Sequence, residues 1–194
     1  MRLVVATKNR NKLREFRQIL GEGFEVVGMD ELGIDAEIVE DADTFEGNAL
    51  KKATEIARLC GFTTVADDSG ICVEALSGAP GVYSARYSGE GATDLSNNLK
   101  LLREMEGQEN RNAKFVCAIA VVFPDGTNKI LKGELHGVID FEMKGENGFG
   151  YDVLFYLPEY KMTTAQLPPD LKNKISHRAK ALGLLKEFLS HTGK

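Results

Sequence analysis

The sequence predicts an α/β fold in which an elongated mixed sheet with flanking helices forms two lobes around a central cleft. Short β-favouring apolar runs alternate with segments whose apolar residues recur at helical spacing, the pattern of strand and helix units. A strongly apolar run at 115–123 is followed by the turn Pro124-Asp125-Gly126 and a second β-favouring run at 129–139. This antiparallel pair departs from a purely doubly wound sheet, so we expect a mixed sheet.

The length and composition favour one domain over residues 1–194. Apolar residues make up 43% of the chain and charged residues 27%, which is ordinary for a folded globular protein. The net charge of −5 argues against nucleic acid as the main partner. Three widely spaced cysteines without a Cys-x-x-Cys pair indicate a reducing compartment. No apolar run has the length that a signal peptide or membrane span needs, so we expect a cytoplasmic protein without a membrane partner.

The first half of the chain predicts two strand and helix pairs. Residues 3–6 and 24–27 are the expected strands, and a helix with the apolar stripe Leu13, Phe16 and Leu20 lies between them. The stretch 30–43 is strongly acidic, and such a stretch is usually a solvated face. A second helix follows; its signals are Thr44 as N-cap, Phe45, Ala49, Ala53, Ala57 and Cys60 as the apolar repeat, and Gly61 as terminator.

The second half predicts two further helices around the antiparallel pair. Residues 77–89 form a long irregular segment that is dense in turn residues, and loops of this length are often functional. The run at 115–123 is apolar at nearly every position, which indicates a central strand buried on both faces. One expected helix carries the stripe Leu95, Leu99, Leu102 and Met105, and the last one begins after Ser176 and includes Leu182, Leu185 and Leu189.

The stretch Val65-Ala66-Asp67-Asp68-Ser69-Gly70 predicts a buried strand that opens into a loop. Adjacent residues of an extended segment point to opposite faces, so Asp67 and Asp68 are expected to differ in role. One of them would hold a divalent cation or activate water, and the other would brace the loop. The alternative is that both acids are ordinary turn residues.

Basic residues occupy two expected helix N-termini, where the helix dipole disfavours cations unless an anion is bound. The loop Thr7-Lys8-Asn9-Arg10-Asn11-Lys12 is one, and His177 and Arg178 are in the other. Together they indicate a polyanionic ligand held from two sides, although the first loop taken alone is equally compatible with a solvated basic turn. Asn48 and Lys52 are one helical turn apart and either face the two acids or form a plain polar face.

Two glycines flank Phe149 in Gly148-Phe149-Gly150-Tyr151-Asp152. Glycine allows the backbone to approach a ligand closely, and the aromatic ring could stack on a nucleobase. The alternative is a structural corner with a buried Phe. The third glycine of a dinucleotide fingerprint is missing, so we do not expect a Rossmann site.

Six motifs, in order, resemble the inosine triphosphate pyrophosphatase family, the XTP/dITP diphosphatases. They are 7–12 (TKNRNK), 45–49 (FEGNA), 66–70 (ADDSG), 84–89 (SARYSG), 148–152 (GFGYD) and 175–178 (ISHR). The resemblance implies a homodimeric, Mg²⁺-dependent enzyme that hydrolyses deaminated purine nucleoside triphosphates (ITP, dITP, XTP) to the monophosphate and pyrophosphate.

The resemblance also implies residue roles. Asp68 would be the catalytic proton acceptor and a metal ligand. Relatives often carry Glu before the Asn of the second motif, where this chain has Gly47, so Glu46 or Glu40 would replace it as second metal ligand. Val153 stands where relatives usually have Pro. The substrate-binding residues would be Thr7, Lys8, Asn9, Arg10, Asn11, Lys12, Ser69, Phe149, Gly150, Tyr151, Asp152, Lys172, His177 and Arg178.

These roles lead to an expected mechanism. Asp68 would deprotonate a water aimed at the α-phosphorus, and pyrophosphate would leave toward Lys8, Arg10 and Lys12. A donor such as Arg178 or a backbone N–H would select the O6 of hypoxanthine and xanthine. The alternatives are a pyrophosphatase for modified pyrimidine nucleotides and a non-enzymatic module that senses a triphosphate. Asp67 and Asp68 argue against the sensor, because carboxylates near phosphates weaken binding unless a metal is present.

Overall fold

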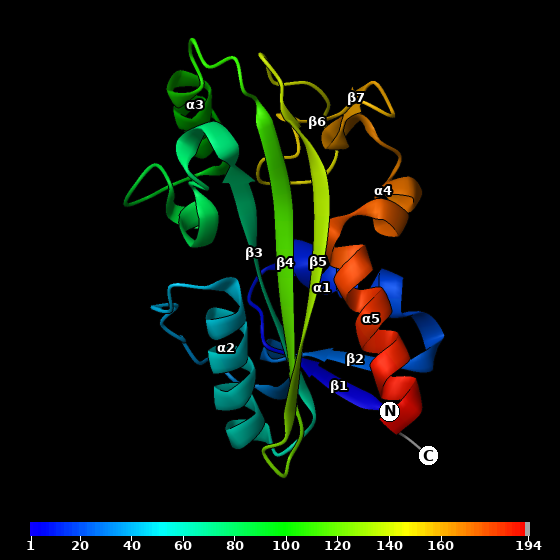
Figure 1. Cartoon of the computed structure of the whole chain (residues 1–194). Helices are drawn as coiled ribbons and strands as arrows, with labels where there is room; N and C mark the ends of the chain where they lie inside the picture. The colour runs from blue at the N-terminus through cyan, green and yellow to red at the C-terminus, as the bar shows by residue number, and fades with distance from the viewer. Residues whose placement is uncertain (193–194) are drawn as a thin grey trace. The chain divides into compact units, whose positions relative to one another are not determined.

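The computed structural model describes residues 1–192, which form a seven-stranded mixed sheet with flanking helices (Figure 1). The strands are β1 (Arg2–Val5), β2 (Glu25–Gly28), β3 (Thr64–Val73), β4 (Asn112–Val122), β5 (Asn128–Ile139), β6 (Phe155–Leu157) and β7 (Met162–Thr163). The α-helices are α1 (Arg10–Leu20), α2 (Phe45–Cys60), α3 (Asp94–Glu104), α4 (Pro169–Ile175) and α5 (His177–Thr192), and short 3₁₀ turns include η4 (Gly81–Arg86).

The strand order is β2-β1-β3-β4-β5-β6-β7. Strand β1 pairs in parallel with β2 and β3, whereas β6 pairs in antiparallel fashion with β5 and β7. The predicted mixed α/β sheet with flanking helices is therefore confirmed, and the cleft between two lobes stays a prediction. Among residues 1–192, no helix combines the length and the hydropathy that a bilayer crossing requires.

The chain divides into two compact units, each built from segments that are far apart in the sequence. The first unit contains Met1–Asp68, Cys117–Gly133 and the C-terminal segment that begins at His177, and the second contains Ser69–Val116 and Glu134–Ser176. Strands β3, β4 and β5 each contribute residues to both units.

The first unit packs helices on both faces of its strands. Helices α1 and α5 cover one face, and α2 covers the other (Figure 1). Alternate strand residues explain this arrangement, because Leu3 and Val5 pack with Phe16 of α1 and Leu185 of α5. As predicted, Thr44 caps α2 by accepting a hydrogen bond from the Gly47 N–H, and Gly61 ends it in the left-handed conformation.

The second unit has its own apolar core, which confirms half of the stripe predicted for α3 and corrects the other half: Met105 is buried in this core and Leu102 packs against it. Leu95 and Leu99 are exposed, whereas the buried face consists of Asn97, Asn98 and Leu101, with Met105 directly after the helix. Two of these buried residues are polar, so a search for apolar periodicity wrongly includes Leu95 and Leu99 in the buried face. The expected central strand over 115–123 is confirmed by β4, whose residues from Phe115 to Val122 are all buried.

Candidate active site

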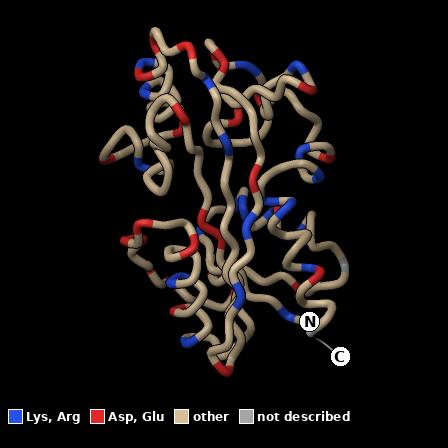
Figure 2. The backbone as a smooth tube through the Cα atoms, in the orientation of Figure 1, with Lys and Arg blue, Asp and Glu red and all other residues tan. Residues whose placement is uncertain are grey.

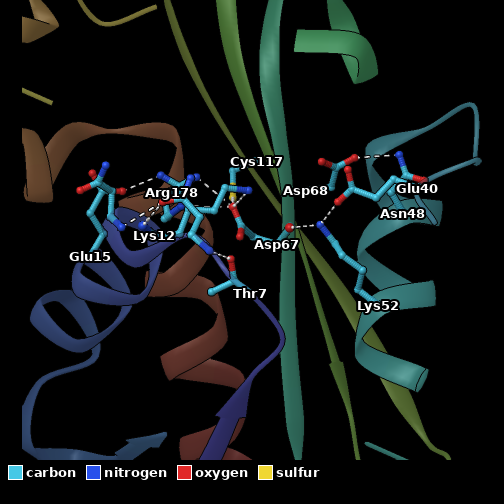
Figure 3. Close-up of polar contacts among 12 residues, drawn as sticks. Thr7, Lys12, Glu15, Glu40, Asn48, Lys52, Asp67, Asp68, Cys117 and Arg178 are labelled. Atoms are coloured by element: carbon cyan, nitrogen blue, oxygen red, sulfur yellow. Dashed lines mark hydrogen bonds and ion pairs between the residues drawn. The ribbon is translucent and has the colours of Figure 1, made fainter. Parts of the chain in front are cut away.

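Asp67 and Asp68 lie inside β3, which continues to Val73, so the predicted loop at this position is wrong. Acids, a hydroxyl and a glycine are typical of turns, but here neighbouring elements supply partners for the two buried carboxylates. The predicted alternation is confirmed: Asp67 points toward α1 and α5, and Asp68 points toward α2 (Figure 3). The two acids therefore have different surroundings.

Asp67 is the centre of a buried ion network. Its Oδ2 accepts hydrogen bonds from Nε and Nη2 of Arg178, at 3.2 and 2.9 Å, and lies 3.1 Å from Nζ of Lys12. The Arg178 Nη1 also donates to Oε2 of Glu15 at 2.5 Å. Burial alone would raise the pKa of Asp67, but the charges of Lys12, Arg178 and Lys52 outweigh burial and hold this pKa well below its usual range. Asp67 therefore stays ionised and braces α1 against α5.

Asp68 has a weaker set of partners on the other face. Its Oδ2 accepts a hydrogen bond from Nδ2 of Asn48 at 2.9 Å. Lys52, one turn later on α2, donates to the backbone oxygen of Asp67 at 2.9 Å and also to Glu40. Burial raises the pKa of Asp68, and the nearby Glu40 raises it further, against the opposing effects of Lys52 and Asn48. Asp68 is thus the more basic of the two carboxylates.

Glu40 and Asp68 are the carboxylates that could share a cation on this face. Mg²⁺ is commonly held by one or two carboxylates together with water and substrate phosphates, so a pair is sufficient. Glu46, the other candidate from the sequence, instead pairs with Lys132 at 3.3 Å. Within residues 1–192 there is no group of three or more His, Cys, Asp and Glu side chains placed to hold a metal without help. This donor set fits a metal that arrives with phosphate.

Gly47 occupies the place where the resembling family often has Glu. A Cβ at this residue would lie 2.8 Å from the Cβ of Ala42 and 3.1 Å from Oγ1 of Thr44. The loop before α2 therefore leaves little room for a side chain at Gly47. The same loop carries most of the acidic stretch, which Figure 2 shows as red segments leading into α2.

Several residues of the basic loop before α1 already form hydrogen bonds or ion pairs within the protein. The Asn9 side chain accepts hydrogen bonds from the backbone N–H of Asn11 and Lys12 and so serves as the N-cap of α1. Lys8 forms an exposed ion pair with Asp35 at 2.7 Å. Arg10 is exposed and makes no ion pair within the described part of the chain. Lys8 and Arg10 are thus the accessible cations of this loop.

Arg178 lies in the first turn of α5, and this turn packs closely against β5 at Gly133. A Cβ at Gly133 would lie 2.2 Å from the backbone oxygen of His177 and 2.6 Å from the backbone nitrogen of Ala181. Neither backbone atom can move without displacing α5. His177 itself is buried at the start of the helix.

We expect Gly133→Ala to lower the free energy of unfolding by about 2 kcal/mol, because the added methyl overlaps backbone atoms of α5. Gly183→Ala is the matched control: Gly183 lies in α5, and a Cβ there meets nothing within 4 Å. The control should be stabilised by about 0.5–1 kcal/mol, since alanine replaces glycine in a helix. Urea unfolding of both variants measures these changes. Equal stability of the two variants would contradict the close approach.

The remaining predicted site residues lie in the second unit. Asp152 is buried and accepts hydrogen bonds from the Phe149 N–H at 2.9 Å, from Lys172 Nζ at 2.6 Å and from Thr164 Oγ1 at 2.8 Å. The hydroxyl of Tyr151 donates to the backbone oxygen of Ser84 at 2.7 Å. The Lys172 Nζ lies 5.0 Å from the centroid of the partly exposed Phe149 ring. Ser69 follows Asp68 in β3 and is partly exposed.

The site residues predicted from the sequence are divided between the two units, and the sequence did not indicate every residue that contacts them. Thr7–Lys12, Asp67, Asp68, His177 and Arg178 are all in the first unit, and Ser69, Phe149–Asp152 and Lys172 are in the second. Glu15 was missed, because no local signal links it to Arg178. The predicted shared face of Asn48 and Lys52 is confirmed, and both side chains donate hydrogen bonds to Asp67 or Asp68. Their spacing on α2 was the available signal.

Comparison with known proteins gives consistent matches over nearly the whole chain. The Ham1 family model matches residues 3–188. A dITP/XTP pyrophosphatase of Geobacter sulfurreducens is 51% identical over 99% of this chain and 98% of its own length. One from Desulforamulus reducens is 49% identical over 98% and 96%. The structure of the Staphylococcus aureus Ham1 protein aligns with a TM-score of 0.90 at 42% identity, covering 99% of this chain and all of that one.

Proposed function

The chain belongs to the Ham1 family, and from this premise we propose that it hydrolyses deaminated purine nucleoside triphosphates (ITP, dITP and XTP) to the monophosphate and pyrophosphate. The matched relatives bear the name dITP/XTP pyrophosphatase, which supports a nucleoside triphosphate pyrophosphatase. The single observation that carries the proposal is that two adjacent acids of β3 have different surroundings. Asp67 is fixed in an ion network, whereas Asp68 has a raised pKa and accepts a hydrogen bond from α2.

A divalent metal, which we propose is Mg²⁺, would be held by Asp68 and Glu40. The structure offers a reason for a cation there, because Glu40 adds to the burial that already disfavours the charged form of Asp68. When bound, such a metal neutralises phosphate charge and increases the electrophilicity of phosphorus. Asn48 and Lys52 hold the two strand residues from α2, so the carboxylate of Asp68 keeps one orientation.

In the proposed reaction, Asp68 accepts a proton from the water that attacks the α-phosphorus. A carboxylate with a raised pKa is a stronger base, which suits proton transfer near neutral pH. Cleavage between the α- and β-phosphates then releases pyrophosphate. The loop of Thr7–Lys12 binds the triphosphate, with Lys8 and Arg10 as its exposed cations. We place Lys12 beside Asp67 as the link between this loop and β3.

For the base and sugar, we propose the second group of residues, Phe149–Asp152 and Lys172. The ring of Phe149 would stack on the purine, since every base offers a π-face to an aromatic side chain. The proposed O6 donor, Arg178 or a backbone N–H, discriminates ITP from ATP by leaving buried groups unpaired when the base is adenine. Arg178 already donates three N–H groups to Asp67 and Glu15, which favours a backbone N–H for this role.

We further propose a cytoplasmic homodimer that acts without nucleic acid or membrane partners. The support is the family resemblance together with the chemistry of the chain. Cys60, Cys72 and Cys117 form no disulfide with one another, as expected of a protein from a reducing compartment. The net charge of −5 is opposite to that of most duplex binders.

The purified protein should release pyrophosphate, and no orthophosphate, from ITP and XTP in the presence of Mg²⁺. We expect little product from GTP or ATP, and no turnover when the metal is chelated. Separate assays of pyrophosphate and orthophosphate measure this result. Orthophosphate as product would move the attack to the γ-phosphorus and contradict the proposal. Binding without turnover would favour the sensor, and activity restricted to modified pyrimidine nucleotides would favour the alternative pyrophosphatase.

A further inference from the structure

Helix α3 turns two asparagines into the second unit, and both contact loops. Asn97 and Asn98 are 3% and 2% exposed. Buried amide N–H groups need acceptors, and here backbone oxygens provide them for both asparagines. Asn97 donates to the backbone oxygens of Ser84 and Ala85 and accepts from the Ser88 N–H. The buried face of α3 therefore organises the irregular segment that the sequence singled out.

The same helix holds both peptide polar groups of Gly150. The Gly150 N–H donates to Oδ2 of Asp94 at 2.7 Å, and its backbone oxygen accepts a hydrogen bond from Nδ2 of Asn98 at 2.8 Å. Asn98 also donates to the backbone oxygen of Asp94 at 2.7 Å, so its amide orientation is fixed. Two residues one turn apart thus form a clamp on Gly150.

A clamp is needed at Gly150 because glycine does not restrain its own backbone. Gly150 has φ +62, and a Cβ there would meet nothing within 4 Å, so side-chain packing does not fix this residue either. The flanking residues have hydrogen bonds of their own, because the Phe149 N–H donates to Asp152 and the Tyr151 hydroxyl donates to Ser84. The Gly150 N–H belongs to the peptide that joins Phe149 to Gly150, so its hydrogen bond to Asp94 restrains the backbone directly after Phe149.

We propose that Asp94 and Asn98 are positioning residues that fix Gly150 and thereby orient Phe149 toward the purine base. The inference rests on the proposed function, in which Phe149–Asp152 binds the base. Asp94 and Asn98 belong to the second unit, whereas Asp68 belongs to the first. The proposed role is therefore in substrate binding rather than in the chemical step. Loss of the clamp is therefore expected to raise KM more than it lowers kcat.

The test compares Asp94→Ala with Asp94→Asn and Thr93→Ala. Asp94→Ala removes the acceptor of Gly150 and should raise the KM for ITP roughly tenfold, with kcat within about twofold of wild type. Asp94→Asn retains an oxygen that accepts the Gly150 N–H, and should bring KM back to within about threefold of wild type. Both variants lose the charge that favours the first turn of α3, so rescue by Asn separates the hydrogen bond from the helix dipole.

Thr93→Ala is the matched control for helix stability. Thr93 caps α3 by accepting a hydrogen bond from the Ser96 N–H, and the other hydrogen bond of its side chain is also to Ser96 rather than to Gly150. It should lower the thermal midpoint while leaving KM unchanged. An equal rise of KM in Thr93→Ala, or failure of Asp94→Asn to rescue, would overturn the inference. If the wild type releases no pyrophosphate from ITP, the proposed function fails instead, which is a distinguishable result.

Discussion

Replacement of Asp68 by Asn is expected to lower kcat for ITP by about 10²–10⁴-fold, the usual contribution of a general base. Asparagine keeps the shape of the side chain but cannot accept the proton of the attacking water. Nucleotide binding should change much less than kcat, because the residues proposed to hold the triphosphate and the base, Thr7–Lys12 and Phe149–Asp152, are unchanged. Steady-state kinetics, together with equilibrium binding of a non-hydrolysable ITP analogue, measures both quantities. A kcat near that of wild type would remove Asp68 from the role of base.

Two acids near α2 test the proposed metal site, one as a ligand and the other as its matched control. Glu40→Gln should reduce activity and raise the Mg²⁺ concentration needed for half-maximal rate, because Glu40 shares the α2 side of β3 with Asp68. Glu46→Gln should behave almost as wild type, since Glu46 pairs with Lys132 on the surface. If the two substitutions had the same metal dependence, the assignment of Glu40 as second carboxylate would be wrong.

Local signals were sufficient where the sequence and the fold agree on one element. Thr44 and Gly61 mark the two ends of α2, and the continuous apolar run of β4 indicates a strand buried on both faces. These features depend on backbone conformation and on burial, which a short stretch of chain encodes by itself. The motif at Asp67 and Asp68 was also found from the sequence, but its conformation was not. Whether two acids end a strand depends on partners elsewhere in the chain.

The cations at the two helix N-termini show the same limit more sharply. Their position predicts an anionic ligand held from two sides, yet Lys12 and Arg178 both form ion pairs with Asp67. Arg178 and Asp67 are 111 residues apart, and Arg178 and Glu15 are 163 apart, so no spacing rule connects them. Only Lys8 and Arg10 remain as accessible cations of the first loop. Part of the positive charge that predicts a polyanionic ligand is therefore already balanced by Asp67 of the protein itself.

The apolar stripe predicted for α3 is wrong at two of its four positions for a related reason, while Leu102 and Met105 do pack in the core. Leucines at Leu95 and Leu99 suggested the buried face, but these positions are exposed and the asparagines are inside. A buried asparagine is stable only when loops from other segments accept its hydrogen bonds, as Ser84 and Gly150 do here. Hydrophobic periodicity contains no information on such partners, so the polar face of a helix can be its buried face.

Arg178→Met is expected to lower the free energy of unfolding by about 3–5 kcal/mol, because it leaves the carboxylates of Asp67 and Glu15 without their buried cation. Methionine keeps much of the volume, so the change mainly reports the charge. Arg2→Met, which removes the exposed ion pair with Glu25, is the control and should have a much smaller effect. Urea denaturation measures the free energy of unfolding of both variants, with the same dependence on urea concentration applied to each.

A double-mutant cycle makes this prediction specific to the ion network. Asp67→Asn alone should also destabilise the protein, since it leaves Arg178 and Lys12 without their shared acceptor. In the presence of Arg178→Met, however, the same substitution removes a carboxylate that has lost its main partner. The double variant should therefore be more stable than the sum of the single changes by about 1–3 kcal/mol. Strict additivity would mean that Asp67 and Arg178 contribute independently, and that the brace between α1 and α5 does not depend on their contact.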